Sequence, residues 1–173
     1  MKTSAVSAVT LAALASLACR PGRDAIVEDA GTSSRATGTV AGKYTAANFA
    51  HLRWIEGRWR GFMPDGKTFY EQYRFVDDST IAMHSFPDST FTKASDSSRV
   101  LLRDSTVANE GLTARWVATR LDTTGVDFAP HHGAQNHFTW ARETPTQWNA
   151  TLRWSDKEGR PRSVVYALHR FGR

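Results

Sequence analysis

From residue 58 onward, apolar and polar residues alternate with a period of two, which is typical of β-strands that bury one face. Phe69, Tyr73 and Phe75, for example, fall on one face of the segment 68–76. Turn-forming sequences such as Pro64-Asp65-Gly66 interrupt the alternation. The pattern predicts about nine or ten short strands, at residues 58–63, 68–76, 80–86, near Phe91, 98–104, 112–121, 125–128, 137–142, 147–154 and 162–170.

One short helix is expected before these strands. Phe49, Leu52 and Ile55 recur at helical spacing within residues 46–56, and Gly57 follows them. A run of short strands closes most readily into a barrel, since closure removes exposed sheet edges. We therefore predict an all-β fold for residues 44–173, an antiparallel up-and-down β-barrel of about 8–10 strands with a short N-terminal helix.

The first 43 residues have a different character. Residues 1–18 combine Lys2 with an apolar run, the layout of a secretory signal. Ser16-Leu17-Ala18-Cys19 resembles a bacterial lipobox, which implies lipidation of Cys19, the lone cysteine of the chain. The alternative is a plain signal peptide that is cut near Ala18. Residues 19–43 are rich in Gly, Pro, Ser and Thr and contain no aromatic residue, so we expect a flexible tether.

These features predict a protein of the bacterial cell envelope. A lipidated Cys19 would hold the protein on a membrane. The residue after Cys19 is Arg20 and not Asp, which favours the outer membrane. Without lipidation the protein would be secreted or periplasmic.

Composition excludes several classes. A single cysteine rules out an intrachain disulfide and a cysteine-rich zinc module. The formal net charge is +5, but the arginines are scattered and form no long basic run. A nucleic-acid partner is therefore not expected.

The opening of the folded segment resembles a known group of barrels. Residues 49–61 read FAHLRWIEGRWRG, similar to the short helix and Gly-x-Trp of calycin-like barrels, with Gly57 and Trp59 in those places. In lipocalins this tryptophan caps the closed end of the barrel. The chain also resembles an uncharacterised calycin-like family of bacterial secreted proteins and lipoproteins, through Trp54 to Trp59, Glu71 and Pro130-His131-His132. The resemblance implies a barrel and, by analogy, a cavity for a small ligand.

Glu71 is the most informative polar position. It alternates in phase with Phe69 and Tyr73, so it should point into the apolar face, where a carboxylate is costly unless it is paired. Arg120 and Arg170 occupy positions where an aliphatic residue is expected, and they are the candidate partners. A bulge that exposes Glu71 is the alternative.

Six tryptophans suggest either an aromatic cavity wall or an ordinary barrel core. The residues that we expect to contact a small, mostly apolar ligand are Glu71, Tyr73, Trp116, Arg120, His132 and Trp140.

The histidines leave further alternatives open. His131, His132 and His137 lie close together, yet consecutive histidines in an extended chain point to opposite faces, so no metal site is predicted. Haem binding through His132, His137 or His169, as in nitrobindin-type barrels, ranks lower, and no cofactor is expected.

No nucleophile elbow or phosphate loop occurs, so a binding protein is favoured over an enzyme. The alternatives are an acid/base enzyme that uses Glu71 with a histidine, and an envelope module without a ligand.

Overall fold

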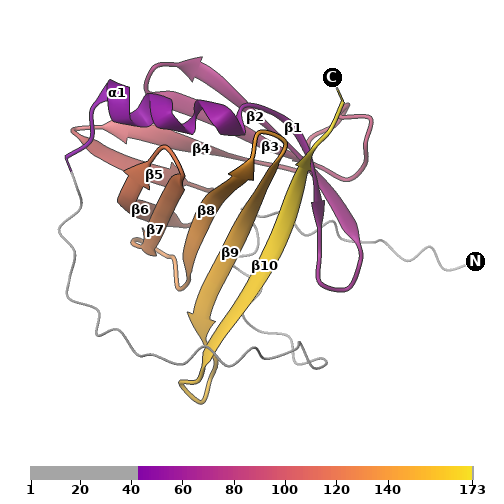
Figure 1. Cartoon of the computed structure of the whole chain (residues 1–173). Coiled ribbons are helices and arrows are strands. Elements are labelled where there is room, and N and C mark those ends of the chain that lie inside the picture. Colours follow the sequence, from indigo (N-terminus) through magenta and orange to yellow (C-terminus); the bar gives the residue numbers. More distant parts are fainter. Residues whose placement is uncertain (1–42, 173) are drawn as a thin grey trace, which may run out of the picture.

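Residues 43–172 are described by a computed structural model, and they form a closed antiparallel barrel (Figure 1). The prediction of an all-β up-and-down barrel is confirmed. The signal sequence and nearly all of the tether lie outside the described residues. The ten strands are β1 (Gly57–Phe62), β2 (Thr68–Asp77), β3 (Thr80–Phe86), β4 (Asp96–Arg103), β5 (Thr106–Glu110), β6 (Arg115–Asp122), β7 (Gly125–Pro130), β8 (His137–Thr144), β9 (Gln147–Ser155) and β10 (Pro161–Arg170).

Each strand pairs with the next one along the chain, and β1 pairs with β10 to close the ring. Trp59 of β1 lies opposite Glu71 on one side and Arg170 on the other. Every strand therefore has two neighbours, and no backbone edge is left for pairing with another chain. We call the end with Gly57 and Arg170 the helix end, and the opposite end the loop end.

A short helical segment covers the helix end, as predicted. It begins as α1 (Ala46–Phe49), capped by Thr45, and tightens into the 3₁₀ helix η2 (Ala50–Ile55). Phe49, Leu52 and Ile55 are fully buried, since the apolar spacing turns these side chains onto the barrel core. Within residues 43–172, no helix is both long and apolar enough to cross a bilayer.

Arg170 fastens this helical cover to the barrel. Its guanidinium carbon lies 4.3 Å from the ring centre of Trp59. The same guanidinium donates hydrogen bonds to the carbonyl oxygens of Glu56 (2.9 Å) and Trp54 (3.1 Å). The Trp59 indole N–H donates to the Ile55 carbonyl oxygen at 2.6 Å. Arg170 is therefore exposed at the helix end, where its guanidinium holds the helical cover.

Two predicted elements differ from the structure. The segment near Phe91 is a loop, because Phe91 has a φ of 56°, which is incompatible with a strand. Residues 106–110 form a strand, although none is predicted between residues 104 and 112. The turn that precedes β5 lies at Asp104 and Ser105, which both have positive φ and form a tight hairpin without glycine.

Candidate functional site

The inner face of β2 carries the polar centre of the barrel. Phe69, Glu71 and Tyr73 point inward, as the alternation predicts, and Glu71 is only 2% exposed. The Tyr73 hydroxyl donates to Glu71 Oε2 at 2.5 Å, and the Ser85 hydroxyl donates to Oε1 at 3.5 Å. A buried carboxylate needs such donors, because burying it without them lowers the free energy of unfolding by roughly several kcal/mol.

Burial raises the pKa of Tyr73 well above its usual value, and the neighbouring Glu71 charge and hydrogen bond raise it further. The phenol therefore keeps its proton at neutral pH and remains a hydrogen-bond donor to the carboxylate.

Polar side chains continue around the wall from Glu71. Ser85 of β3, Ser98 of β4 and Asn109 of β5 are all buried and lie on successive strands. Ser98 and Asn109 both donate to the Met83 sulfur, at 3.5 and 3.7 Å. A thioether is a weak acceptor, so these two groups keep hydrogen-bonding capacity. We call Glu71, Ser85, Ser98 and Asn109 the polar row.

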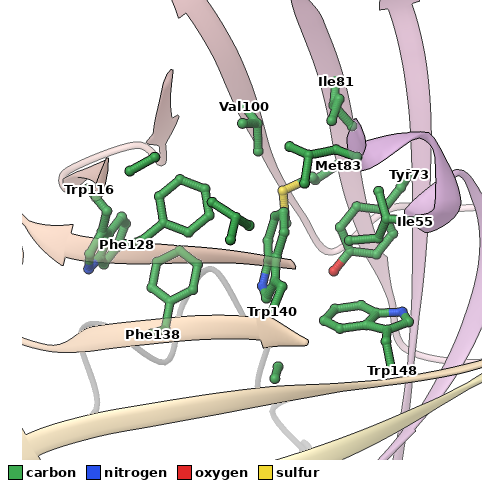
Figure 2. Close-up of a cluster of buried hydrophobic side chains, with 14 of the residues drawn as sticks. Ile55, Tyr73, Ile81, Met83, Val100, Trp116, Phe128, Phe138, Trp140 and Trp148 are labelled. Carbon is green, nitrogen blue, oxygen red and sulfur yellow. The ribbon is translucent and has the colours of Figure 1, made fainter. Parts of the chain in front are cut away.

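The strands on the other side of the barrel carry an aromatic wall (Figure 2). The rings of Trp140 and Trp148 lie 5.8 Å apart, and Tyr73 packs edge-on against both of them at 5.7 Å. Phe128 and Phe138 stack at 4.6 Å beside Trp140. We define the aromatic wall as Trp116, Phe128, Phe138, Trp140 and Trp148.

Two indole N–H groups of this wall are buried without a hydrogen-bond acceptor. They belong to Trp140, which is 1% exposed, and Trp148, which is fully buried. Trp59 donates to Ile55, and Trp116 donates to the Asn136 carbonyl oxygen at 2.9 Å. The Trp54 indole N–H, on the helical cover, also lacks a partner. An unsatisfied buried donor costs about 1–3 kcal/mol. Trp140 and Trp148 are therefore the places inside the barrel where an acceptor atom would be most stabilising.

Arg120 does not face the lumen, so its predicted position is wrong. A bulge between Ala118 and Arg120 shifts the register of β6 against β7 and turns the side chain outward. There its Nε donates to Asp127 at 2.7 Å, and Nη1 bonds Asp122. Turn hydrogen bonds from Thr124 and the Arg120 charge lower the pKa of Asp122 to about 2.

The histidines lie away from Glu71 in the sheet. His84 pairs with Gln72, one residue out of phase with Glu71, so it sits on the outer face. His132 lies in the exposed loop 131–136, where it lines a groove of about 200 Å³ with residues 110–115. Within residues 43–172, no three His, Cys, Asp or Glu side chains gather closely enough to hold a metal ion.

The structure thus brings together Glu71, Tyr73 and Trp140 inside the barrel, with Trp116 near the loop end of the same wall. It separates them from Arg120 and His132. Sequence reasoning omitted Trp148, Ser85, Ser98 and Asn109 from the site. Ser85 continues the inward phase of Ile81 and Met83, so the pattern contained that signal. Asn109 lies between the predicted strands 98–104 and 112–121, so its inward direction was not predicted.

A second groove lies on the outer face of β6–β9 and has a volume of about 390 Å³. The residues that line it are Thr119, Asp127, Phe128, His137, Phe138, Thr139 and Arg153. Arg153 Nη1 already donates to the Thr139 hydroxyl at 2.9 Å. Two of its polar side chains therefore bond each other, whereas the barrel interior holds two unsatisfied indole donors.

The raised pKa of Tyr73 makes a testable prediction about stability. An unfolded tyrosine ionises near pH 10, while the buried Tyr73 stays neutral to a higher pH, so the stability that it contributes is present below about pH 10 and is lost above it. Wild-type protein should lose about 1.4 kcal/mol per pH unit in that range relative to Tyr73→Phe. Urea unfolding at about pH 8 and about pH 11 measures the difference. A constant gap between the two proteins would contradict the burial of this phenol.

Comparison with known proteins adds little. No protein-family model and no curated protein matches the chain. Among solved structures, a redesigned β-barrel is similar, with 11% identity and a TM-score of 0.35 over 69% of this chain and 93% of the other. At that score the similarity carries no argument, and the assignment of a barrel rests on the strand pairing itself.

Proposed function

We propose that this protein binds a small, mostly apolar molecule inside its barrel, and that the molecule carries an oxygen acceptor. The observation that carries the proposal is the pair of buried, unsatisfied indole N–H groups of Trp140 and Trp148. A planar apolar body would pack against the aromatic wall, and an acceptor oxygen would take an indole hydrogen bond. Ser98 and Asn109 of the polar row offer further donors on the opposite strands. Ligand sites typically combine such apolar walls with a few convergent polar groups.

We further propose a calycin-like identity for the barrel. Gly57 and Trp59 open β1 directly after a short helical segment, in the order that the family resemblance requires. The packing of Trp59 beneath Arg170 at the helix end supports this proposal.

Membrane attachment through Cys19 completes the proposed role, that of a bacterial envelope lipoprotein. The support is the lipobox-like sequence alone, and that segment lies outside the described residues. Expression in a bacterium should yield a chain whose N-terminal fragment carries the mass of a diacylglyceryl group on Cys19. The Cys19→Ser variant should lack that mass. A wild-type chain without the added mass would refute the anchor.

Binding inside the barrel can be tested with 6-propionyl-2-dimethylaminonaphthalene, a planar probe that has one carbonyl acceptor. We expect saturable binding to the full chain, with a blue shift of probe emission and energy transfer from tryptophan. Trp140→Phe keeps an aromatic ring and removes the N–H, so it should weaken binding roughly 5- to 10-fold, the value of about one hydrogen bond.

Two controls sharpen this experiment. Phe62→Leu alters an aromatic residue on the outer face of β1 and should leave binding unchanged. 2-Dimethylaminonaphthalene lacks the carbonyl and should bind wild type and Trp140→Phe equally. If the carbonyl probe does not bind, or binds wild type, Trp140→Phe and Trp148→Phe alike, the proposed site inside the barrel is wrong.

A further inference from the structure

The outer face of β1–β4 carries a set of arginines that no described carboxylate neutralises. Arg58 and Arg60 project from β1, Arg74 from β2 and Arg99 from β4, and all four are exposed. Within residues 43–172, none of them forms an ion pair. We call these four arginines, with His84 and His169, the basic face.

The strand register makes these residues neighbours. Arg60 lies opposite Tyr70 on one side and His169 on the other. Arg58 lies opposite Gln72, which in turn pairs with His84. The positions follow one another across strands about 4.8 Å apart, so the basic residues form one continuous surface although they are scattered in the sequence.

Acidic residues are absent from the middle of this surface. The described strands β1, β3 and β10 contain no Asp or Glu. In β2, Glu71 faces the barrel interior and Asp77 is the last residue of the strand. Asp96 is the first residue of β4, and Glu110 lies opposite Arg99 at the edge of the face but pairs with Arg115. An uncompensated cationic surface of this kind attracts an anionic partner.

Aromatic rings hold two of the arginines in place. The Arg58 guanidinium lies 4.7 Å from the centre of the Phe91 ring, and that of Arg60 lies 4.9 Å from the Phe62 ring. Tyr70 and Phe91 pack edge-on at 5.8 Å between them. Arginines beside aromatic side chains suit a lipid–water interface, where phosphates lie next to apolar chain segments.

We propose that the basic face binds the anionic headgroup surface of a phospholipid membrane. The choice of a membrane among anionic partners rests on the anchor at Cys19 proposed above, since a tether of residues 19–43 would keep the barrel within roughly 30 Å of the headgroups. The face then orients the barrel on the membrane, which an acyl anchor alone does not do.

Vesicle sedimentation tests this proposal independently of the anchor. Full-length Cys19→Ser protein carries no acyl group on that residue, and residues 1–18 are common to every variant made in this background, so differences in binding between those variants report the folded surface. We expect it to bind vesicles of phosphatidylcholine with about one third phosphatidylglycerol, and to bind pure phosphatidylcholine vesicles far more weakly. Binding should fall steeply when NaCl is raised from about 0.05 M to about 0.5 M.

Two triple variants with the same net charge separate the basic face from overall charge. In this background, Arg60→Gln/Arg74→Gln/Arg99→Gln should weaken partitioning on the order of 100-fold, at about a factor of five for each arginine. The control Arg142→Gln/Arg153→Gln/Lys157→Gln removes exposed charges on and beside β8 and β9 and should change partitioning less than about threefold.

The proposal fails if both triples lose binding equally, if neutral and anionic vesicles bind alike, or if the face retains single-stranded DNA but no vesicle. None of these outcomes bears on the mass of Cys19, so the anchor and the basic face can fail separately.

Discussion

Replacing Trp148 with alanine is expected to cost about 4 kcal/mol of unfolding free energy, as large-to-small changes of a fully buried aromatic residue do. Trp148 lies at the centre of the interior, with ring contacts to Trp54 (5.9 Å), Trp59 (6.1 Å), Tyr73 (5.7 Å) and Trp140 (5.8 Å). Its removal leaves a cavity between the helical cover and the aromatic wall, which the barrel cannot close without breaking strand pairs.

Urea unfolding followed by circular dichroism measures this loss. Val165→Ala is the matched control on the neighbouring strand, since Val165 is 51% exposed and its truncation should cost less than about 0.5 kcal/mol. Trp148→Phe keeps a ring and should fall between the two. A loss of less than about 1 kcal/mol for Trp148→Ala would show that this ring is not packed as described.

Gly125→Ala is expected to destabilise the barrel by about 3 kcal/mol, at the upper end of the usual cost of overpacking. An added Cβ at Gly125 would overlap the Trp140 carbonyl oxygen and crowd the backbone of Ala141 on β8. A backbone neighbour cannot rotate away as a side chain can, so the β7–β8 pairing has to separate.

Gly111→Ala is the control for this substitution. Its added Cβ would meet the Ala114 carbonyl oxygen at 3.6 Å, an ordinary contact, so stability should change little or rise slightly. Thermal unfolding of both variants measures the contrast. Equal melting temperatures for the two variants would mean that β7 and β8 do not approach as closely as the structure shows.

Most of the fold could be predicted from the sequence because the signals are local. Period-two alternation located most of the strands, and the spacing of Phe49, Leu52 and Ile55 located the helix. The same alternation placed Glu71 inside. The strand Thr106–Glu110 was missed because its hairpin turn, Asp104-Ser105, lacks the usual glycine.

The failures at the site arise from non-local structure. The bulge at Ala118–Arg120 shifts the phase of the rest of β6, so that Leu121 instead of Arg120 is buried, and nothing in the residue types there indicates it. Phe91 looks like a strand residue, yet its ring is buried in an aromatic cluster outside the barrel. Whether an indole N–H finds an acceptor depends on residues from other strands, so the distinction between Trp140 and Trp59 could not be read from the sequence.

The indole N–H region of a ¹⁵N–¹H NMR spectrum tests the central claim most directly, with each tryptophan assigned by its Trp→Phe variant. On addition of 6-propionyl-2-dimethylaminonaphthalene, we expect the N–H resonance of Trp140, Trp148 or both to move downfield as an acceptor arrives. Those of Trp59 and Trp116, already bonded to Ile55 and Asn136, should shift much less. Unchanged Trp140 and Trp148 resonances at a saturating probe concentration would contradict ligand binding in the barrel.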